Sequence, residues 1–196
     1  GAVVVGEIDN VIRARTERMH KLLQIFEPDA VLTDDIWGYL WGKMGYGAML
    51  FATALTSDSM TANFADLDRG PALTGLAREV IRTAVAEGAN PRPFNGFEPK
   101  AFMPDAADAS ALKSLAALAE FNAQTAKTHS GIYRDLAVRK RKTEVDQQLG
   151  VVVDIAADHG IDTPLLRRLI ELIHDIEAGR REMSVSSFHE LTRVMP

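Results

Sequence analysis

A single lysine in an otherwise uncharged stretch is the residue best placed to do chemistry. Lys43 is the only charged side chain between Ile36 and Ser57. A helix that is apolar on nearly every face is buried, and a buried ammonium acquires a lowered pKa or a dedicated partner. A lysine in that state can donate a proton near neutral pH. If Lys43 instead lies near the start of the helix, its ammonium can reach solvent along its aliphatic stem, and the burial argument favours neither outcome.

The same stretch is rich in glycine, at positions 38, 42, 45 and 47. Each glycine costs roughly 1 kcal/mol relative to alanine inside a helix, so another backbone or a ligand is expected to come close. Helix-on-helix packing is the more common cause. Along the Lys43 face, Gly47 and Phe51 follow at i+4 and i+8, and we expect both to flank whatever Lys43 faces.

A second cluster of polar residues lies between residues 129 and 146. Thr143, with Glu144 and Asp146 behind it, is typical of a helix N-terminus that carries acids in its first turn. The basic run at residues 139–142 is most simply a solvated turn rather than an anion site. Spacing alone does not make Glu144 catalytic.

Several classes of function are excluded by what the sequence lacks. The five histidines are scattered without helical metal-site spacing, so we expect no metal. Cysteine is absent, and so are the Gly-x-Gly-x-x-Gly, P-loop and Gly-x-Ser-x-Gly motifs, which leaves no visible site for a dinucleotide pyrophosphate. The net charge of −5 argues against a nucleic-acid partner. The uncharged run after Lys43 spans only about a dozen residues, which favours a buried helix over a membrane span.

The remaining pattern predicts a mainly α protein. Residues 2–7 and 30–33 read as strands around a helix at residues 13–26. From residue 34 onward we expect about five or six helices, with a proline-rich loop at residues 88–104 and a weakly patterned tail at residues 183–196. The predicted helices cover residues 34–57, 71–87, 105–127, 143–160 and 163–179.

The strand–helix–strand segment resembles the end of an α/β domain rather than a domain of its own. The apolar run at residues 2–5 needs neighbouring strands on both sides, and no strand precedes it. We therefore expect a chain cut from something longer. Residues 1–33 would be the remnant of an N-terminal nucleotide-binding domain, and residues 34–196 a helical C-terminal domain.

Taken in order, several motifs resemble those of the ketopantoate reductase (2-dehydropantoate 2-reductase) family. Residues 35–36 and 41–44 are similar to its D-I … W-x-K-L signature, which leads the long helix of its C-terminal domain. Residues 130–135 and 141–146 resemble S-S-M-x-x-D … R-x-T-E-I-D, and residues 159–164 resemble an H-G-I-x-x-P turn. The resemblance covers nearly the whole chain.

This resemblance implies a fold, a reaction and a set of residues. The family pairs an N-terminal nucleotide-binding domain with a helical C-terminal domain of the 6-phosphogluconate-dehydrogenase-like type, and its active site lies between them. Lys43 matches the lysine that donates a proton to the substrate carbonyl as NADPH delivers hydride. Glu144 matches an acidic residue that contacts substrate and cofactor. Ser130 falls near the substrate-binding serine, although alignment on Asp135 places Gly131 at that position.

We therefore expect a cytoplasmic oxidoreductase that reduces a 2-keto acid or related carbonyl compound, with a role in pantothenate biosynthesis if the substrate is ketopantoate. NADPH would be held mainly by the nucleotide domain, so the isolated chain should be inactive. The expected partner is a small carbonyl substrate, with neither nucleic acid nor membrane, and the apolar helix faces allow a homodimer.

The chain also departs from the family. The family usually has asparagine four residues after the lysine, and often again four later, whereas this sequence has Gly47 and Phe51. A phenylalanine beside a glycine builds an apolar wall with space next to it, so we expect a bulkier or less polar substrate than ketopantoate. The rival interpretation is a non-catalytic dimerisation or interaction domain that kept the fold and lost the chemistry.

Overall fold

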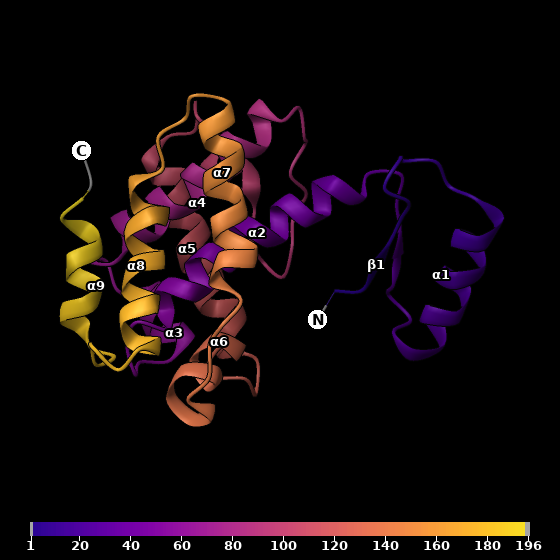
Figure 1. Cartoon of the computed structure of the whole chain (residues 1–196). Helices are drawn as coiled ribbons and strands as arrows, with labels where there is room; N and C mark the ends of the chain where they lie inside the picture. Colours follow the sequence, from indigo (N-terminus) through magenta and orange to yellow (C-terminus); the bar gives the residue numbers. More distant parts are fainter. Residues whose placement is uncertain (1, 195–196) are drawn as a thin grey trace.

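The computed structural model describes residues 2–194 and consists of a small N-terminal unit joined to a larger helical domain (Figure 1). In the N-terminal unit, strands β1 (Val4–Val5) and β2 (Val31–Leu32) pair in parallel, and helix α1 (Ala14–Phe26) connects them. A parallel pair requires such a crossover, because a short hairpin joins only antiparallel strands. The predicted strand–helix–strand order is confirmed, with shorter strands than expected.

The helical domain begins with α2 (Ile36–Thr53), α3 (Met60–Ala65) and α4 (Gly70–Ala86). A 3₁₀ turn, η1 (Pro99–Phe102), precedes α5 (Asp108–Ala123) and the short α6 (Gly131–Tyr133). Two π-helical segments follow, η2 (Arg134–Arg139) and η3 (Asp146–Gly150), the second running directly into α7 (Val151–Asp158). Helices α8 (Pro164–Glu177) and α9 (Val185–Thr192) complete the domain, so the predicted mainly α class is confirmed.

Helix α2 runs from the N-terminal unit into the middle of the helical domain (Figure 1). It packs most extensively against α4, and their buried side chains form one continuous core with those of the later helices. The largest side chains in this core include Phe51, Phe97, Phe102 and Phe188, all almost fully buried. The α2 sequence is apolar because its C-terminal half lies inside this core.

Residues at the helix ends explain where the helices start and stop. Asp35 caps α2, since its Oδ1 accepts a hydrogen bond from the Gly38 backbone N–H at 3.0 Å. Pro164 is the first residue of α8, where its missing N–H is not needed. Gly160 and Gly179 follow α7 and α8 with positive φ angles that favour glycine. These predicted boundaries are confirmed.

Helices α3 and α9 depart from the prediction. Each is short, with six and eight residues, and neither repeats an apolar face often enough to be recognised by periodicity. Both begin at a serine cap, Ser59 and Ser184, which is the signal that identifies them. Helix α9 lies in the tail predicted to be weakly patterned, and residues 195–196 of that tail lie outside the described part. Within residues 2–194, every helix is too short or too polar to cross a bilayer.

Candidate functional site

The start of α2 is fixed by the segment that follows α4. We call residues 88–93 the strap, because they cross the first two turns of α2. The Arg92 backbone N–H donates to the Gly38 carbonyl at 2.8 Å, and the Arg92 Nε donates to the Asp35 carboxylate at 2.7 Å. Asp35 therefore caps its own helix with one oxygen and holds the strap with the other.

Two glycines of α2 make room for the strap. A Cβ atom at Gly38 would lie 2.5 Å from the Asn90 carbonyl oxygen, and a Cβ at Gly42 would overlap the Arg92 carbonyl oxygen. Their cost in helix stability is thus explained by close approach of another backbone, as the sequence suggested. Gly47 differs, since the nearest atom to its Cβ position is the Gln148 Oε1 at 3.8 Å, and the space beside it is open.

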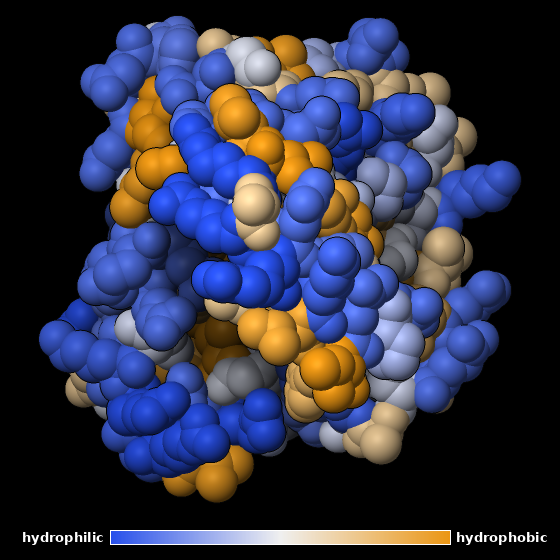
Figure 2. Space-filling model, turned by 90° about the vertical axis from the view of Figure 1, so that its right-hand side faces the viewer, coloured by the Kyte–Doolittle hydropathy of each residue, from blue (hydrophilic) through white to orange (hydrophobic). Residues whose placement is uncertain are grey.

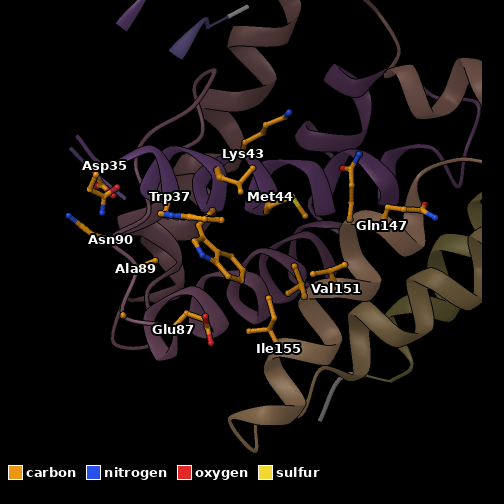
Figure 3. Close-up of a pocket in the computed structure, with 16 residues that line it drawn as sticks. Asp35, Trp37, Lys43, Met44, Glu87, Ala89, Asn90, Gln147, Val151 and Ile155 are labelled. Carbon is orange, nitrogen blue, oxygen red and sulfur yellow. The ribbon is translucent and has the colours of Figure 1, made fainter. Parts of the chain in front are cut away.

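Lys43 is exposed rather than buried. Its side chain leaves α2 on the side away from Glu87 and Ile155 (Figure 3). Of the two outcomes that the sequence left open, the one observed is that in which the aliphatic stem carries the charge to solvent. The face of α2 that carries Lys43 is exposed, and the helix is apolar because its other faces are buried.

A cavity of about 850 Å³ opens beside Lys43, and its lining includes both tryptophans of the chain. One wall is a single face of α2, and the facing wall comes from η3 and α7 (Figure 3). We call this cavity the tryptophan groove. Its apolar lining consists of Trp37, Leu40, Trp41 and Met44 on one side and Val151, Val152 and Ile155 on the other.

A second cavity of about 300 Å³ lies between α2 and the N-terminal unit. Trp37, Leu40 and Lys43 line both cavities, so Lys43 lies where the two meet. The Trp37 indole N–H donates to the Ile8 carbonyl at 2.8 Å and joins the loop after β1 to the first turn of α2. Lys43 is thus positioned at the junction of the two units of the chain.

Glu144 reaches this region through a neighbouring amide. It is exposed, and its carboxylate accepts a hydrogen bond from the Gln148 Nε2 at 2.9 Å. Gln148 lines the tryptophan groove and is the side chain nearest to the open position at Gly47. Gly47, Gln148 and Glu144 therefore follow one another along the edge of the groove, one helical turn beyond Lys43.

Ser130 and Phe51 lie elsewhere. The Ser130 side chain is 1% exposed and caps α6, accepting a hydrogen bond from the Tyr133 backbone N–H at 3.1 Å. Phe51 is 1% exposed and belongs to the helical core. The expected apolar wall at Phe51 is therefore misplaced, because the C-terminal half of α2 has entered the core by that residue. Neither side chain lines either of the two cavities beside Lys43.

The basic run at residues 139–142 forms a turn around an acid. Arg139 and Arg141 both pair with Asp135, at 2.9 and 3.0 Å, and the Arg141 hydrogen bond is the main reason that the pKa of Asp135 is lowered. Lys140, between them, has a φ of 51°, which turns the chain back. The predicted solvated turn is confirmed, and two of its positive charges are neutralised within it.

The residue that follows β1 is tied to α1. In open α/β sheets, ligands bind at the carboxyl ends of the strands, and here that end is followed by Glu7. A hydrogen bond from Arg15, with a second from Thr16, lowers the pKa of Glu7 to about 2, and this carboxylate is paired with Arg15. Gly6 is explained by packing, since its Cβ would lie 2.7 Å from the Thr33 carbonyl oxygen.

The apolar groove-lining residues of α2 were not among the predicted site residues. The signal for them is in the sequence: residues 37, 40, 41 and 44 have the i, i+3, i+4, i+7 spacing of one apolar helix face. Such a face usually packs into a core, and only the structure shows that α7 leaves it partly open. Trp37 and Leu40 accordingly remain 44% and 42% exposed.

Comparison with known proteins supports the resemblance seen in the motifs. Residues 35–177 match the family described as "Ketopantoate reductase PanE/ApbA C terminal". The 2-dehydropantoate 2-reductase of Archaeoglobus fulgidus is 27% identical over 179 residues, which are 91% of this chain and 54% of that protein. The chain therefore spans about half the length of this curated relative.

Solved structures share the fold. The PanE/ApbA family ketopantoate reductase from Ralstonia eutropha JMP134 has a TM-score of 0.66 at 19% identity, covering 92% of this chain and 53% of that one. A ternary structure of D-mandelate dehydrogenase with NADH and anilino(oxo)acetate has a TM-score of 0.64 at 18% identity, covering 86% and 64%. The family match extends over most of the chain and includes α2, η3, α7 and α8. The chain belongs to the family of ketopantoate reductase C-terminal domains.

Proposed function

We propose that this chain is the substrate-binding and proton-donating part of a nicotinamide-dependent oxidoreductase. The reaction would interconvert the carbonyl of a 2-oxo acid and the hydroxyl of a 2-hydroxy acid, with NADPH as the cofactor. The observation that carries the proposal is the position of Lys43, the charged side chain shared by two cavities within a chain of this family. The names of the relatives, a 2-dehydropantoate reductase and a D-mandelate dehydrogenase, agree with this class of reaction.

The chemistry assigned to Lys43 is general acid catalysis. Reduction at a carbonyl carbon places negative charge on the oxygen, and the Lys43 Nζ–H can transfer a proton to that oxygen as the charge develops. The resulting neutral amine recovers its proton from solvent, which the exposed position of Lys43 allows. Glu144, held by Gln148 one turn along, would orient the substrate at the other side of the opening.

The nicotinamide nucleotide would be held by other residues, since the sequence given contains no Gly-x-Gly-x-x-Gly motif. We propose that residues 1–33 end a nucleotide-binding domain and that residues 34–196 form the helical catalytic domain. The exposed apolar side chains of α1 support this division, because Leu22, Ile25 and Phe26 are 56%, 83% and 84% exposed. An apolar face of this kind needs further protein to cover it.

Lys43→Ala tests the proposal in a protein that carries this chain together with its nucleotide-binding part. Removal of the general acid should lower kcat by about 10²–10⁴-fold while NADPH still binds. Lys113→Ala, which removes an exposed lysine from α5, is the matched control and should retain full turnover. Equal turnover in the two variants would refute the assignment of Lys43.

A second candidate function follows from the exposure of Lys43. A helical dimerisation or interaction domain that has lost catalysis would place no demand on Lys43, and an exposed lysine fits such a surface. In that case the protein would bind no 2-oxo acid and would show no turnover for Lys43→Ala to reduce. Wild-type turnover of any 2-oxo acid with NADPH or NADH decides against this alternative.

A further inference from the structure

The segment that carries Glu144 is held in place by a residue of another helix. We infer that Glu177, the last residue of α8, is a positioning residue that fixes the backbone on both sides of Glu144. Glu177 thereby sets where the Glu144 carboxylate lies. This inference rests on the proposed function, in which Glu144 orients the substrate. It adds a residue that acts through Glu144 and does not itself touch the substrate.

The Glu177 carboxylate accepts two hydrogen bonds from a single threonine. The Thr143 backbone N–H donates to the Glu177 Oε1 at 2.7 Å, and the Thr143 hydroxyl donates to the same oxygen at 2.7 Å. The Thr143 Oγ1 in turn accepts a hydrogen bond from the Val145 backbone N–H at 3.3 Å. The residues before and after Glu144 are therefore linked to one carboxylate, which lies 34 residues from Thr143 in the sequence. Hydrogen bonds to a carboxylate are stronger than those between neutral groups.

This link lies where the chain passes from an exposed turn into the core. Residues 139–142 are all exposed, whereas Val145 is 1% exposed and belongs to the helical core. Thr143 and Glu144 join these two parts, and η3 begins directly after Val145. If Glu177 were removed, the Thr143 backbone would lose its connection to α8, and the start of the Glu144 segment could follow the motion of the exposed turn.

Two further contacts restrict the residues around Glu144. One turn before Glu177 on α8, the His174 Nε2 lies 3.0 Å from the Asp146 carboxylate. The Gln148 Nε2 donates to the Glu144 carboxylate itself at 2.9 Å. Gln148 can hold this carboxylate only where the backbone presents it. The backbone position that Glu177 fixes therefore determines where the negative charge lies.

The link belongs to the helical domain and not to the N-terminal unit. Figure 2, seen from the side of α1, shows apolar patches between charged side chains. The exposed Ile25 and Phe26 belong to α1, which packs against β1 and β2. Segment η3 packs against α2, α7 and α8, so helices of one domain fix the position of Glu144.

A double-mutant cycle tests the inference in a protein that carries this chain together with its nucleotide-binding part. The value of kcat/KM is measured with NADPH and either 2-dehydropantoate or phenylglyoxylate, the 2-oxo acid that corresponds to mandelate. A misplacement of about 1 Å can cost about 100-fold in rate, so Glu177→Ala should lower kcat/KM by about 10–100-fold. In a Glu144→Ala background the same change should cost less than about twofold, because no carboxylate is left to position. A purely structural role would give the same factor in both backgrounds.

Changes at Thr143 test the same link from its other end and keep the test available if Glu177→Ala fails to fold. Thr143→Val keeps only the backbone donor and should lower kcat/KM by about 3–10-fold, again only when Glu144 is present. Thr143→Ser keeps both donors and should recover this loss. Glu171→Ala is the matched control, because Glu171 is an exposed acid of α8 that pairs with Arg168 at 2.7 Å, and its removal should leave kcat/KM unchanged.

Hydrogen exchange reports the placement of the segment without any need for turnover. The Thr143 and Val145 amides should exchange at least about tenfold faster in Glu177→Ala than in Glu171→Ala. An unchanged exchange rate at Thr143, an unchanged kcat/KM in Glu177→Ala, or equal factors in the two backgrounds would each overturn the inference. Failure of the proposed function is distinguishable. In that case the wild type reduces neither 2-oxo acid, and faster exchange in Glu177→Ala shows that Glu177 nevertheless fixes the Glu144 segment.

Discussion

The close contact between α2 and the strap predicts opposite effects for alanine at two glycines of the same helix. At Gly47 the nearest atom to an added Cβ is 3.8 Å away, so Gly47→Ala gains helix propensity without a clash. The free energy of unfolding should rise by up to about 1 kcal/mol. At Gly42 the added Cβ would overlap the Arg92 carbonyl oxygen, which belongs to the backbone and cannot move independently of the strap.

The cost at Gly42 has two parts. Relief of the overlap displaces the strap and weakens the hydrogen bond from Arg92 to Gly38, worth about 1 kcal/mol. Overpacking of this kind costs about 1–3 kcal/mol more, against a propensity gain of about 1 kcal/mol. Gly42→Ala should therefore destabilise the chain by about 1–3 kcal/mol, and the two variants should differ by about 2–4 kcal/mol.

Urea denaturation measures both variants, and an unchanged m value shows that the same transition is being compared. Because the strap also lines the tryptophan groove at Ala89 and Asn90, Gly42→Ala should change the shape of the groove, whereas Gly47→Ala should not displace the strap. Equal stability of the two variants would refute the close approach of the strap to α2, and with it the explanation of the glycines.

Substitutions at Glu79 and Asp35 test two carboxylates that accept hydrogen bonds from the first turns of α8 and α2. Burial raises the pKa of Glu79 to about 7, although two backbone N–H groups at the start of α8 donate to its carboxylate and oppose that rise. The folded-state pKa lies above the unfolded value of 4.5, so the contribution of this group is fully present below about pH 4.5 and is lost as the pH rises through about 7. The loss is on the order of 3 kcal/mol, so the free energy of unfolding of the wild type should fall between pH 5 and 8. Glu79→Gln should make this fall smaller. An unchanged dependence of the unfolding free energy on pH would contradict the raised pKa. Asp35→Ala removes the cap of α2 and the strap ion pair and should cost about 1–2 kcal/mol, whereas Asp35→Asn keeps a capping oxygen and should cost under about 1 kcal/mol. Equal losses in thermal or urea unfolding would mean that the ion pair, and not the cap, carries the stabilisation.

The fold was largely predictable because its signals are local. A proline, a capping aspartate and a terminal glycine each act within one turn. Helices α4 and α8 begin and end close to where such residues place them, and α2 begins at its capping aspartate but ends at Thr53, one turn before the predicted residue 57. The short helices α3 and α9 were not predicted, because six to eight residues contain too few repeats to define an apolar face. The contacts between the strap and α2 were not predicted either, since a glycine in the sequence does not indicate which backbone segment approaches it.

The site was predictable only in part, because helical spacing fixes the face of a residue but not its depth. Lys43, Gly47 and Phe51 lie on one stripe of α2, as predicted. The helix passes from the N-terminal unit into the core, however, so the same stripe is exposed at Lys43, open at Gly47 and fully buried at Phe51. Depth depends on how α4, α6, α8 and η3 pack against α2, which no pattern within α2 contains.

The course of α2 from the N-terminal unit into the core also explains why the charged Lys43 and the apolar tryptophan groove lie next to each other. The first turns of α2 are held by the strap, through the Arg92–Gly38 backbone hydrogen bond and the Arg92–Asp35 ion pair, and by the Trp37 indole N–H, which donates to the Ile8 carbonyl. Lys43 is exposed on this part of the helix, Trp37 is 44% exposed and Trp41 is buried, and all three line the tryptophan groove. A charged group and an apolar groove are thereby fixed on one helix, with the Lys43 side chain directed away from Glu87 and Ile155 of the groove. The separation between the two is therefore set by the geometry of a single helix and does not require movement of the helical domain.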